Sequence, residues 1–114
     1  MLIEITPETF DVELEIAYAT ADNFTGQQIY RRPRALLHPD AAEKLQAAII
    51  LARRLGYRFR VYDAFRPLEA QWALWRAVPG SPYVADPRRG GPHTRGVAVD
   101  LTLLDRAGQP LDMG

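Results

Sequence analysis

The sequence predicts an α+β fold in which helices flank a small antiparallel sheet, because it contains two different hydrophobic periodicities. Apolar residues recur every three to four positions at 39–55, the period of an amphipathic helix. Apolar and polar residues alternate at 57–62 and again at 97–103, the period of a strand with two unlike faces. No repeat and no change of composition suggests a linker, so we expect a single domain over residues 1–114.

The composition limits the classes of function that this domain could have. Of its 114 residues, 47% are hydrophobic and 25% are charged, as in a globular domain. Fourteen basic and fourteen acidic residues cancel, so we expect neither nucleic-acid binding nor attraction to an anionic membrane. The start of the chain lacks the features of a signal peptide, and no apolar run approaches the ~20 residues that span a bilayer, so we expect a cytoplasmic protein.

The absence of cysteine restricts the chemistry further. A chain without cysteine has no disulfide framework, no thiolate zinc site and no cysteine nucleophile. Any metal ion would have to be bound by histidine, aspartate or glutamate.

The first half of the chain is expected to contain a strand, a turn and the clearest helix. Alternation over Val12–Ile16 indicates a half-buried strand, and Asn23–Gly26 has the composition of a turn. The helix at Pro39–Leu55 has proline and aspartate in its first turn, and Gly56 follows it as a usual helix end. One apolar stripe should face the core, and it consists of Ala41, Leu45, Ala48, Ile49 and Ala52.

The second half is expected to alternate regular elements with irregular segments. The strand at 57–62 ends in Asp63–Pro67, and a second helix follows at about Leu68–Val78. Four prolines and three glycines at 79–92 indicate a long loop, and long loops in compact domains are often functional. Asp105–Gly108 should turn the chain. The last strand should face the core through Val97, Val99, Leu101 and Leu103.

His93 and Asp100 are the candidate metal ligands. Imidazole nitrogen and carboxylate oxygen are good zinc ligands, and a strand with its entry loop would hold them rigidly. On an unbroken strand the two side chains would point to opposite faces, and Gly96 is the residue that could allow the necessary bend. The alternative is a loop histidine and a carboxylate satisfied by backbone donors. Asp100 nevertheless lies in an expected core strand, where it needs a partner, and a metal ion is one.

Arg66 is the candidate catalytic residue. Pro67 favours extended backbone at Arg66, and a position at the end of a strand would present the guanidinium at the rim of a site. A permanently charged bidentate donor suits the developing charge of an oxyanion. A structural ion pair with Asp63 explains Arg66 equally well.

Three other residues have simpler explanations. His38, the second histidine, precedes a helix and is expected to cap it or to face solvent. Trp72 and Trp75 lie on one side of the second helix and are expected to be core side chains.

Three segments of the chain form a more specific pattern than any single residue. They are YATADNFTG at Tyr18–Gly26, YDAFRP at Tyr62–Pro67 and HTRGVAVDLTL at His93–Leu103. In order and spacing they resemble the VanX-type D-alanyl-D-alanine dipeptidases over nearly all of the chain. The resemblance implies the fold of the zinc D-Ala-D-Ala peptidases, the hedgehog and DD-peptidase type. The His-to-Asp motif also occurs in zinc D,D-carboxypeptidases and murein endopeptidases.

The resemblance also implies roles for individual residues. His93 and Asp100 would bind Zn²⁺, and Arg66 would stabilise the tetrahedral intermediate in the hydrolysis of a D-Ala-D-Ala-like dipeptide. A third ligand, a histidine, and a catalytic glutamate would lie in a downstream Glu-x-x-His motif, which this sequence does not contain. The family pattern has a serine two positions before the metal histidine, whereas this chain has Gly91.

The missing motif leads to an expectation about a partner. A catalytic zinc site normally has three protein ligands, so two should bind the ion weakly. We expect residues 1–114 to be the N-terminal part of a dipeptidase catalytic domain, with a second polypeptide, from cleavage after Gly114 or from a split gene, supplying the rest. The alternatives are a catalytically inactive binding module and a related carboxypeptidase or endopeptidase that acts on longer peptidoglycan stems.

Overall fold

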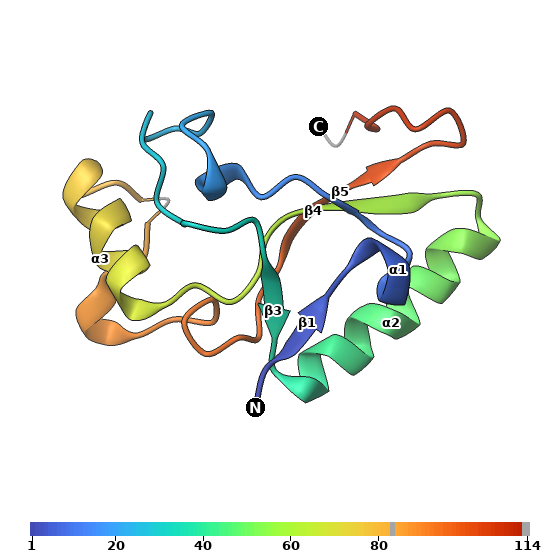
Figure 1. The fold of residues 1–114 in the computed structure, drawn as a ribbon, viewed down its shortest axis with the longest axis horizontal. Helices are drawn as coiled ribbons and strands as arrows, with labels where there is room; N and C mark the ends of the chain where they lie inside the picture. Colours follow the sequence, from blue (N-terminus) through green and yellow to red (C-terminus); the bar gives the residue numbers. More distant parts are fainter. Residues whose placement is uncertain (83, 113–114) are drawn as a thin grey trace.

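The protein has the predicted α+β architecture in its computed structural model, which describes residues 1–82 and 84–112 (Figure 1). Strands β1 and β3 form an antiparallel pair, and a second sheet has the order β2-β4-β5. Tyr83, in the predicted loop, and Gly114, the predicted cleavage point, lie outside the described residues. The elements in chain order are β1 (Ile3–Ile5), α1 (Pro7–Phe10), β2 (Glu13–Leu14), η1 (Ala17–Ala19), β3 (Ala35–Leu37), α2 (Pro39–Arg54), β4 (Arg58–Asp63), α3 (Leu68–Ala77), η2 (Pro87–Arg89) and β5 (Asp100–Leu104).

Helix α2 confirms the clearest prediction from the sequence. The Nδ1 atom of His38 accepts a hydrogen bond of 3.1 Å from the backbone N–H of Asp40, so His38 caps the helix as expected. Gly56, with φ +84°, lets the chain leave the helix. The buried face differs slightly from the predicted stripe: Ala41 and Ala48 are only partly buried. Its buried members are Ala42, Leu45, Ile49 and Ala52.

The three-stranded sheet is mixed, since only one of its two strand pairs is antiparallel. Strand β4 pairs with β5 in antiparallel register, with Arg58 opposite Leu104. Strand β2 is shorter than the predicted strand at Val12–Ile16 and pairs with β4 in parallel. The chain passes through β3 and α2 between β2 and β4, which is long enough for the crossover that parallel pairing requires.

Strand β5 differs from its prediction in length and in its most buried face. It begins at Asp100, three residues later than expected. Val99 and Leu101 pack against the hydrophobic core, as predicted, but remain partly exposed. The buried side chains of β5 are Thr102 and Leu104, on the opposite face. Because β5 lies at the edge of its sheet, its core-facing side chains have a neighbouring strand on one side only.

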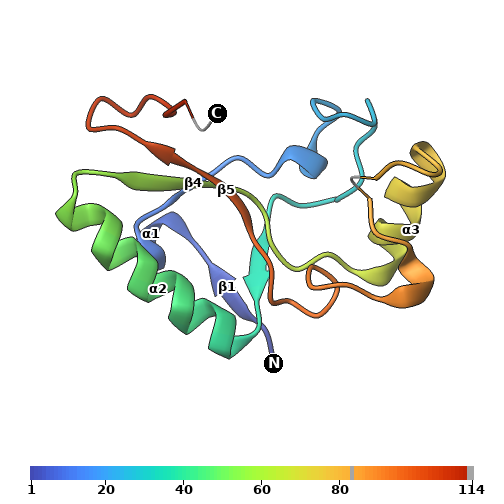
Figure 2. The same ribbon diagram turned by 180° about the vertical axis from the view of Figure 1, so that it is seen from behind.

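Helix α3 stands at the far end of the molecule from α2 and α1 (Figures 1 and 2). None of its described residues belongs to the main core cluster, which β1 to β4 and α2 dominate. It buries Ala70, Gln71 and Leu74, whereas Trp72 and Trp75 are half-buried, so the expectation of two core tryptophans is only partly met. The predicted loop follows α3 and contains one 3-10 turn, η2. Among the described residues, no helix is both long and apolar enough to cross a membrane.

Candidate metal centre

His93 and Asp100 come together because the chain turns sharply between them. The backbone N–H of Gly96 donates to the carbonyl of His93 at 3.1 Å. Gly96 has φ +76°, and a Cβ at this position would lie 3.2 Å from the backbone nitrogen of His38, so conformation and space both favour glycine. The bend that the sequence required at Gly96 is therefore present, and the Nε2 of His93 lies 3.4 Å from an oxygen of Asp100.

The second ring nitrogen of His93 determines which nitrogen can bind a metal ion. Nδ1 lies 2.9 Å from the carbonyl oxygen of Ala64, which can only accept, so Nδ1 carries the proton of the neutral ring. Nε2 then holds the lone pair, and it faces Asp100. A metal-binding histidine usually has its other N–H held by a carbonyl or carboxylate in this way.

The separation of the two donor atoms fits one shared ion. Two ligands at about 2.1 Å from a tetrahedral ion lie about 3.4 Å apart, and the separation between the two side chains is 3.4 Å. The Asp100 side chain is 50% exposed, so the expectation of a carboxylate in the core is wrong, and the reason is that β5 starts at this residue. Its exposure leaves carboxylate oxygens accessible to an ion.

Asp63 lies beside this pair but already has a full set of partners. Asp63, His93 and Asp100 each offer one possible metal-ligand atom, and these three atoms lie within 4.8 Å of one another. The Oδ1 atom of Asp63 accepts from the hydroxyl of Tyr30 at 2.7 Å and from a backbone N–H, and its Oδ2 accepts from Arg66. Asp63 is 1% exposed, so binding an ion would break one of these buried hydrogen bonds. Asp63 is best described as the counter-ion of Arg66.

Arg66 forms the structural ion pair with Asp63 and also faces the candidate metal centre. Its Nη2 and Nε donate to Oδ2 of Asp63 at 2.7 and 3.1 Å, and its Nη1 donates to Oε1 of Gln71 at 2.8 Å. The same Nη2 lies 3.8 Å from Oδ2 of Asp100, and the guanidinium lies 5.4 Å from the centre of the Tyr18 ring. Arg66 is only 7% exposed, so the expectation that it lies at a rim is wrong.

The ionisation of the two carboxylates is controlled by different causes. Burial raises the pKa of Asp63, and the charge of Arg66 opposes this shift. The contact with His93 lowers the pKa of Asp100, while the same contact raises the pKa of His93. Asp100 is therefore held in the ionised form that a metal ligand requires.

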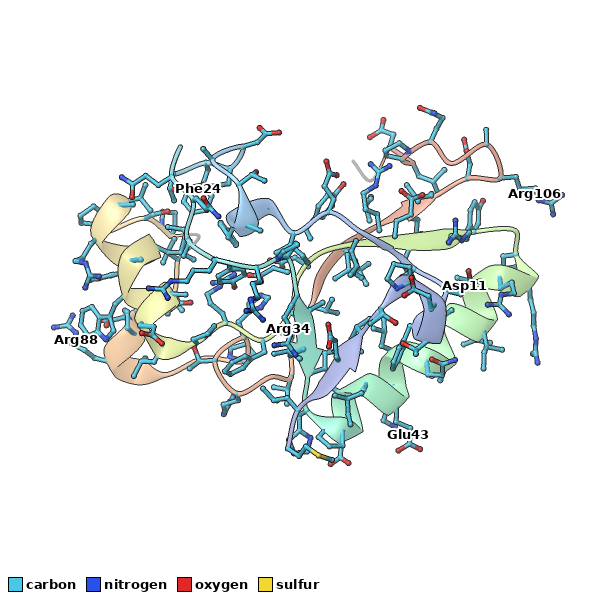
Figure 3. All side chains as sticks on the ribbon, viewed as in Figure 1. Asp11, Phe24, Arg34, Glu43, Arg88 and Arg106 are labelled. Atoms are coloured by element: carbon cyan, nitrogen blue, oxygen red, sulfur yellow. The ribbon has the colours of Figure 1, made fainter. Side chains whose placement is uncertain are left out.

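Arg66, His93 and Asp100 line a cavity of about 210 Å³. Tyr18 and Phe24, with ring centres 6.1 Å apart, contribute aromatic surface to it, and Phe24 extends from the segment after η1 (Figure 3). The cavity thus combines charged donors with an aromatic side, as small-molecule sites commonly do.

Gly91 also lines this cavity, at the position where the related pattern has serine. A Cβ on Gly91 would meet only the side chain of Ala85, at 3.8 Å, which is ordinary contact. A serine would therefore fit here without displacing its neighbours.

The sequence assigned no role to three polar residues of this region, Tyr18, Tyr30 and Gln71, whereas the alternative of an ion pair between Arg66 and Asp63 is observed. Tyr18 lies inside a segment that carries the family resemblance, so that motif contained a signal. Gln71 lies on the buried face of α3, where a polar side chain needs a partner, and this was a second signal. Tyr30 carried none, because its partner lies far along the chain.

The fold and these side chains define an α+β domain with a histidine–aspartate candidate metal centre beside a buried arginine. Residues 2–114 match the family model Peptidase_M15, described as D-ala-D-ala dipeptidase, and the chain belongs to this metallopeptidase family.

Curated relatives agree with this family. The chain is 49% identical over 104 residues to the D-alanyl-D-alanine dipeptidase of Escherichia coli K12. The aligned region covers 91% of this chain and 54% of that protein. It is 33% and 32% identical to the D-alanyl-D-alanine dipeptidases of Enterococcus faecium and Enterococcus faecalis, over 90% of this chain and 61% of each relative. The chain thus spans just over half the length of the curated relatives that it matches.

Proposed function

We propose that this chain supplies two zinc ligands and an oxyanion-binding arginine for the hydrolysis of D-Ala-D-Ala-like dipeptides. The observation that carries the proposal is the pairing of His93 Nε2 with Asp100 at 3.4 Å, with the other ring nitrogen held by a backbone carbonyl. Membership of the Peptidase_M15 family supports the reaction class. Three relatives named D-alanyl-D-alanine dipeptidase support the choice of substrate.

Each residue would have a distinct task in this reaction. His93 and Asp100 would hold the ion, and zinc, when bound, would polarise the scissile carbonyl and lower the pKa of a water molecule. Arg66 would donate hydrogen bonds to the oxygen that becomes negatively charged. Its partners Asp63 and Gln71 hold the guanidinium in place, so it needs no reorganisation when that charge develops.

The cavity of about 210 Å³ supports a substrate with a small apolar side chain. Tyr18 and Phe24 add aromatic surface that a small apolar side chain could contact. A cytoplasmic location stays a prediction from the sequence.

Hydrolysis also requires a third ligand and a general base that these 114 residues do not supply. Neither His38 nor His93 is preceded by glutamate at the third position before it. We propose that a Glu-x-x-His segment provides both groups, and we retain a second polypeptide as its source.

The proposal is tested by intact-mass measurement of a native preparation, followed by zinc titration and a D-Ala-D-Ala hydrolysis assay with and without chelator. We expect weak zinc binding and no turnover by the 114-residue chain alone, and turnover when a Glu-x-x-His polypeptide is present. Turnover by the chain alone would show that the missing base is not needed. If the chain binds no zinc, this result would support the alternative that it is a catalytically inactive binding module without a metal ion.

The role of Arg66 is tested separately in an active complex. Arg66→Lys keeps the charge beside Asp63 but loses the planar set of donors. We expect kcat to fall by roughly 100-fold or more, with unchanged zinc content. Loss of zinc together with activity would assign Arg66 a structural role instead.

A further inference from the structure

A groove of about 690 Å³ lies on the other side of residues 64–66 from the candidate metal centre. This short segment runs between two partners. The backbone N–H of Phe65 donates to the carbonyl of Leu36 in β3 at 2.7 Å, and the N–H of Arg66 donates to the carbonyl of His93 at 2.9 Å. The side chain of Arg66 lines the cavity of the candidate metal centre, whereas Phe65 lines the groove. The groove is therefore a separate feature, which the proposed hydrolysis does not use.

The floor of this groove is apolar. The segment that leads into β3 lies beside helix α3 (Figure 1), and the groove runs between them. The apolar side chains that line it are buried or partly buried, and they are Ile29, Leu36, Phe65, Pro67, Ala70 and Ala73. Such a floor can cover the apolar body of a ligand, since burying apolar surface drives binding.

The rim of the groove carries an excess of positive charge. Its charged side chains are exposed, and they are Arg31, Arg32, Arg34 and Glu69. Glu4 neutralises Arg34 at a distance of 3.2 Å. Within residues 1–82 and 84–112, Arg31 and Arg32 form no ion pair. These two arginines outweigh Glu69 by one charge, so the rim is suited to a ligand with a single negative charge.

The backbone that carries the two unpaired arginines is anchored at both ends. The N–H groups of Ile29 and Tyr30 both donate to the carbonyl of Tyr18, at 2.8 and 2.7 Å. The hydroxyl of Tyr30 donates to Asp63 at 2.7 Å. At the other end, β3 pairs with β1. Binding an anion therefore has to order arginine side chains only, and not the segment that holds them, which lowers the entropic cost of binding.

We propose that this groove binds a small organic monoanion, a carboxylate on an apolar body, at a site separate from the candidate metal centre. The guanidinium groups of Arg31 and Arg32 present the planar sets of donors that match a carboxylate. The apolar body covers the floor between the segment and α3. The volume of about 690 Å³ lies within the roughly 300–1,000 Å³ of typical ligand pockets.

The test titrates the 114-residue chain with 2-naphthoate and with 2-naphthamide, which has the same rings and no charge. NMR shifts of the Leu36 and Ala73 methyl groups report binding in the groove. We expect 2-naphthoate to bind with a Kd of about 1 mM or tighter, and 2-naphthamide to bind roughly 10-fold more weakly. Equal affinities would show that the arginines do not bind the probe. Shifts confined to Tyr18 and His93 would place the probe at the candidate metal centre. Either result overturns the proposal.

Two double variants separate the rim from the net charge of the protein. Arg31→Gln with Arg32→Gln should raise the Kd of 2-naphthoate roughly 10-fold. Arg89→Gln with Arg106→Gln is the matched control, because it removes the same charge from two exposed arginines outside the groove. The control should change the Kd by less than about two-fold. Equal weakening by the two double variants would reduce the effect to net charge and overturn the proposal.

The same titration is repeated with a fusion in which the part of the E. coli relative that follows the aligned residues is joined after Gly114. Binding of 2-naphthoate should persist in the fusion, because residues 64–66 separate the groove from the candidate metal centre. Loss of binding would show that the rest of the catalytic domain fills the groove, and would overturn the proposal. None of these measurements needs zinc or substrate, so failure of the proposed activity is seen separately.

Discussion

Two neighbouring groups of polar side chains in this molecule are built in opposite ways. In the first, Asp63, Arg66 and Gln71 are each less than a tenth exposed, and each bonds to the next. In the second, His93 and Asp100 share one contact of 3.4 Å, and half of the Asp100 side chain is open to solvent. A closed group holds a guanidinium in one position, whereas an open pair keeps donor atoms available for an ion.

The difference between the groups should appear first in stability. Asp63→Ala leaves the guanidinium of Arg66 and the hydroxyl of Tyr30 without their buried acceptor. We expect the free energy of unfolding to fall by about 3–5 kcal/mol, as for other broken buried pairs. Asp100→Ala should cost less than about 1 kcal/mol, because its contacts are half-exposed. Urea denaturation of both variants measures these losses. Equal losses in the free energy of unfolding would show that the group around Asp63 contributes no more to stability than the His93–Asp100 pair.

The open pair should respond most strongly to metal. Zinc at 100 times its dissociation constant should stabilise the folded chain by about 2.7 kcal/mol. His93→Ala should abolish this gain because it removes the Nε2 donor. His38→Ala is the control, since His38 is a helix cap and does not face Asp100. The measurement is thermal unfolding with and without zinc, and loss of the zinc effect in His38→Ala would place the metal elsewhere.

The contrast between the groups also shows which parts of the structure the sequence could predict. Helix α2 and strand β4 form where local periodicity predicts them, because each buries one regular face, and helix α3 follows Pro67 as expected. The meeting of His93 and Asp100 was predictable as well, because a glycine at position 96 was the one residue that could allow the bend. Local patterns were sufficient for these features.

Features that depend on distant parts of the chain could not be predicted in this way. Three features depend on residues that lie far apart in sequence. They are the parallel pairing of β2 with β4, the position of β5 at the edge of its sheet, and the contact between Tyr30 and Asp63. For this reason Asp100 was expected in the core and Arg66 at a rim, and their actual exposures are the reverse. Tertiary packing decides which strands and side chains pair with one another, and this choice produces no periodic pattern in the local sequence.

Gln71 tests how the closed group is held against the following loop. Its Nε2 donates to the carbonyl of Ala85 at 2.8 Å while its Oε1 accepts from Arg66. Gln71→Leu removes both bonds in a buried site, and we expect a loss of about 1–3 kcal/mol. Hydrogen exchange should quicken near Ala85 and stay unchanged in α2. If exchange near Ala85 does not change, other contacts hold the loop after α3, and the role of Gln71 is limited to its hydrogen bond with Arg66.

The smallest expected effect is the pH dependence of the open pair. The contact with Asp100 raises the pKa of His93, so this pair stabilises the metal-free fold at pH values below the ordinary histidine pKa. That contribution is lost as the pH rises through the raised value. On the acid side it is lost as the pH falls through the lowered pKa of Asp100. In Asp100→Asn the pKa of His93 should fall, which an NMR titration of the ring measures.

Zinc reverses the direction of this dependence, because a metal ligand must be neutral imidazole. Between about pH 6 and 8, the metal-free chain should lose a little stability as His93 deprotonates, while the gain in Tm on adding zinc should grow. Thermal unfolding across this range, with and without zinc, measures both trends on one sample. If the zinc gain shrinks as the pH rises, protons and metal do not compete for His93 Nε2, and the open pair is not the metal centre.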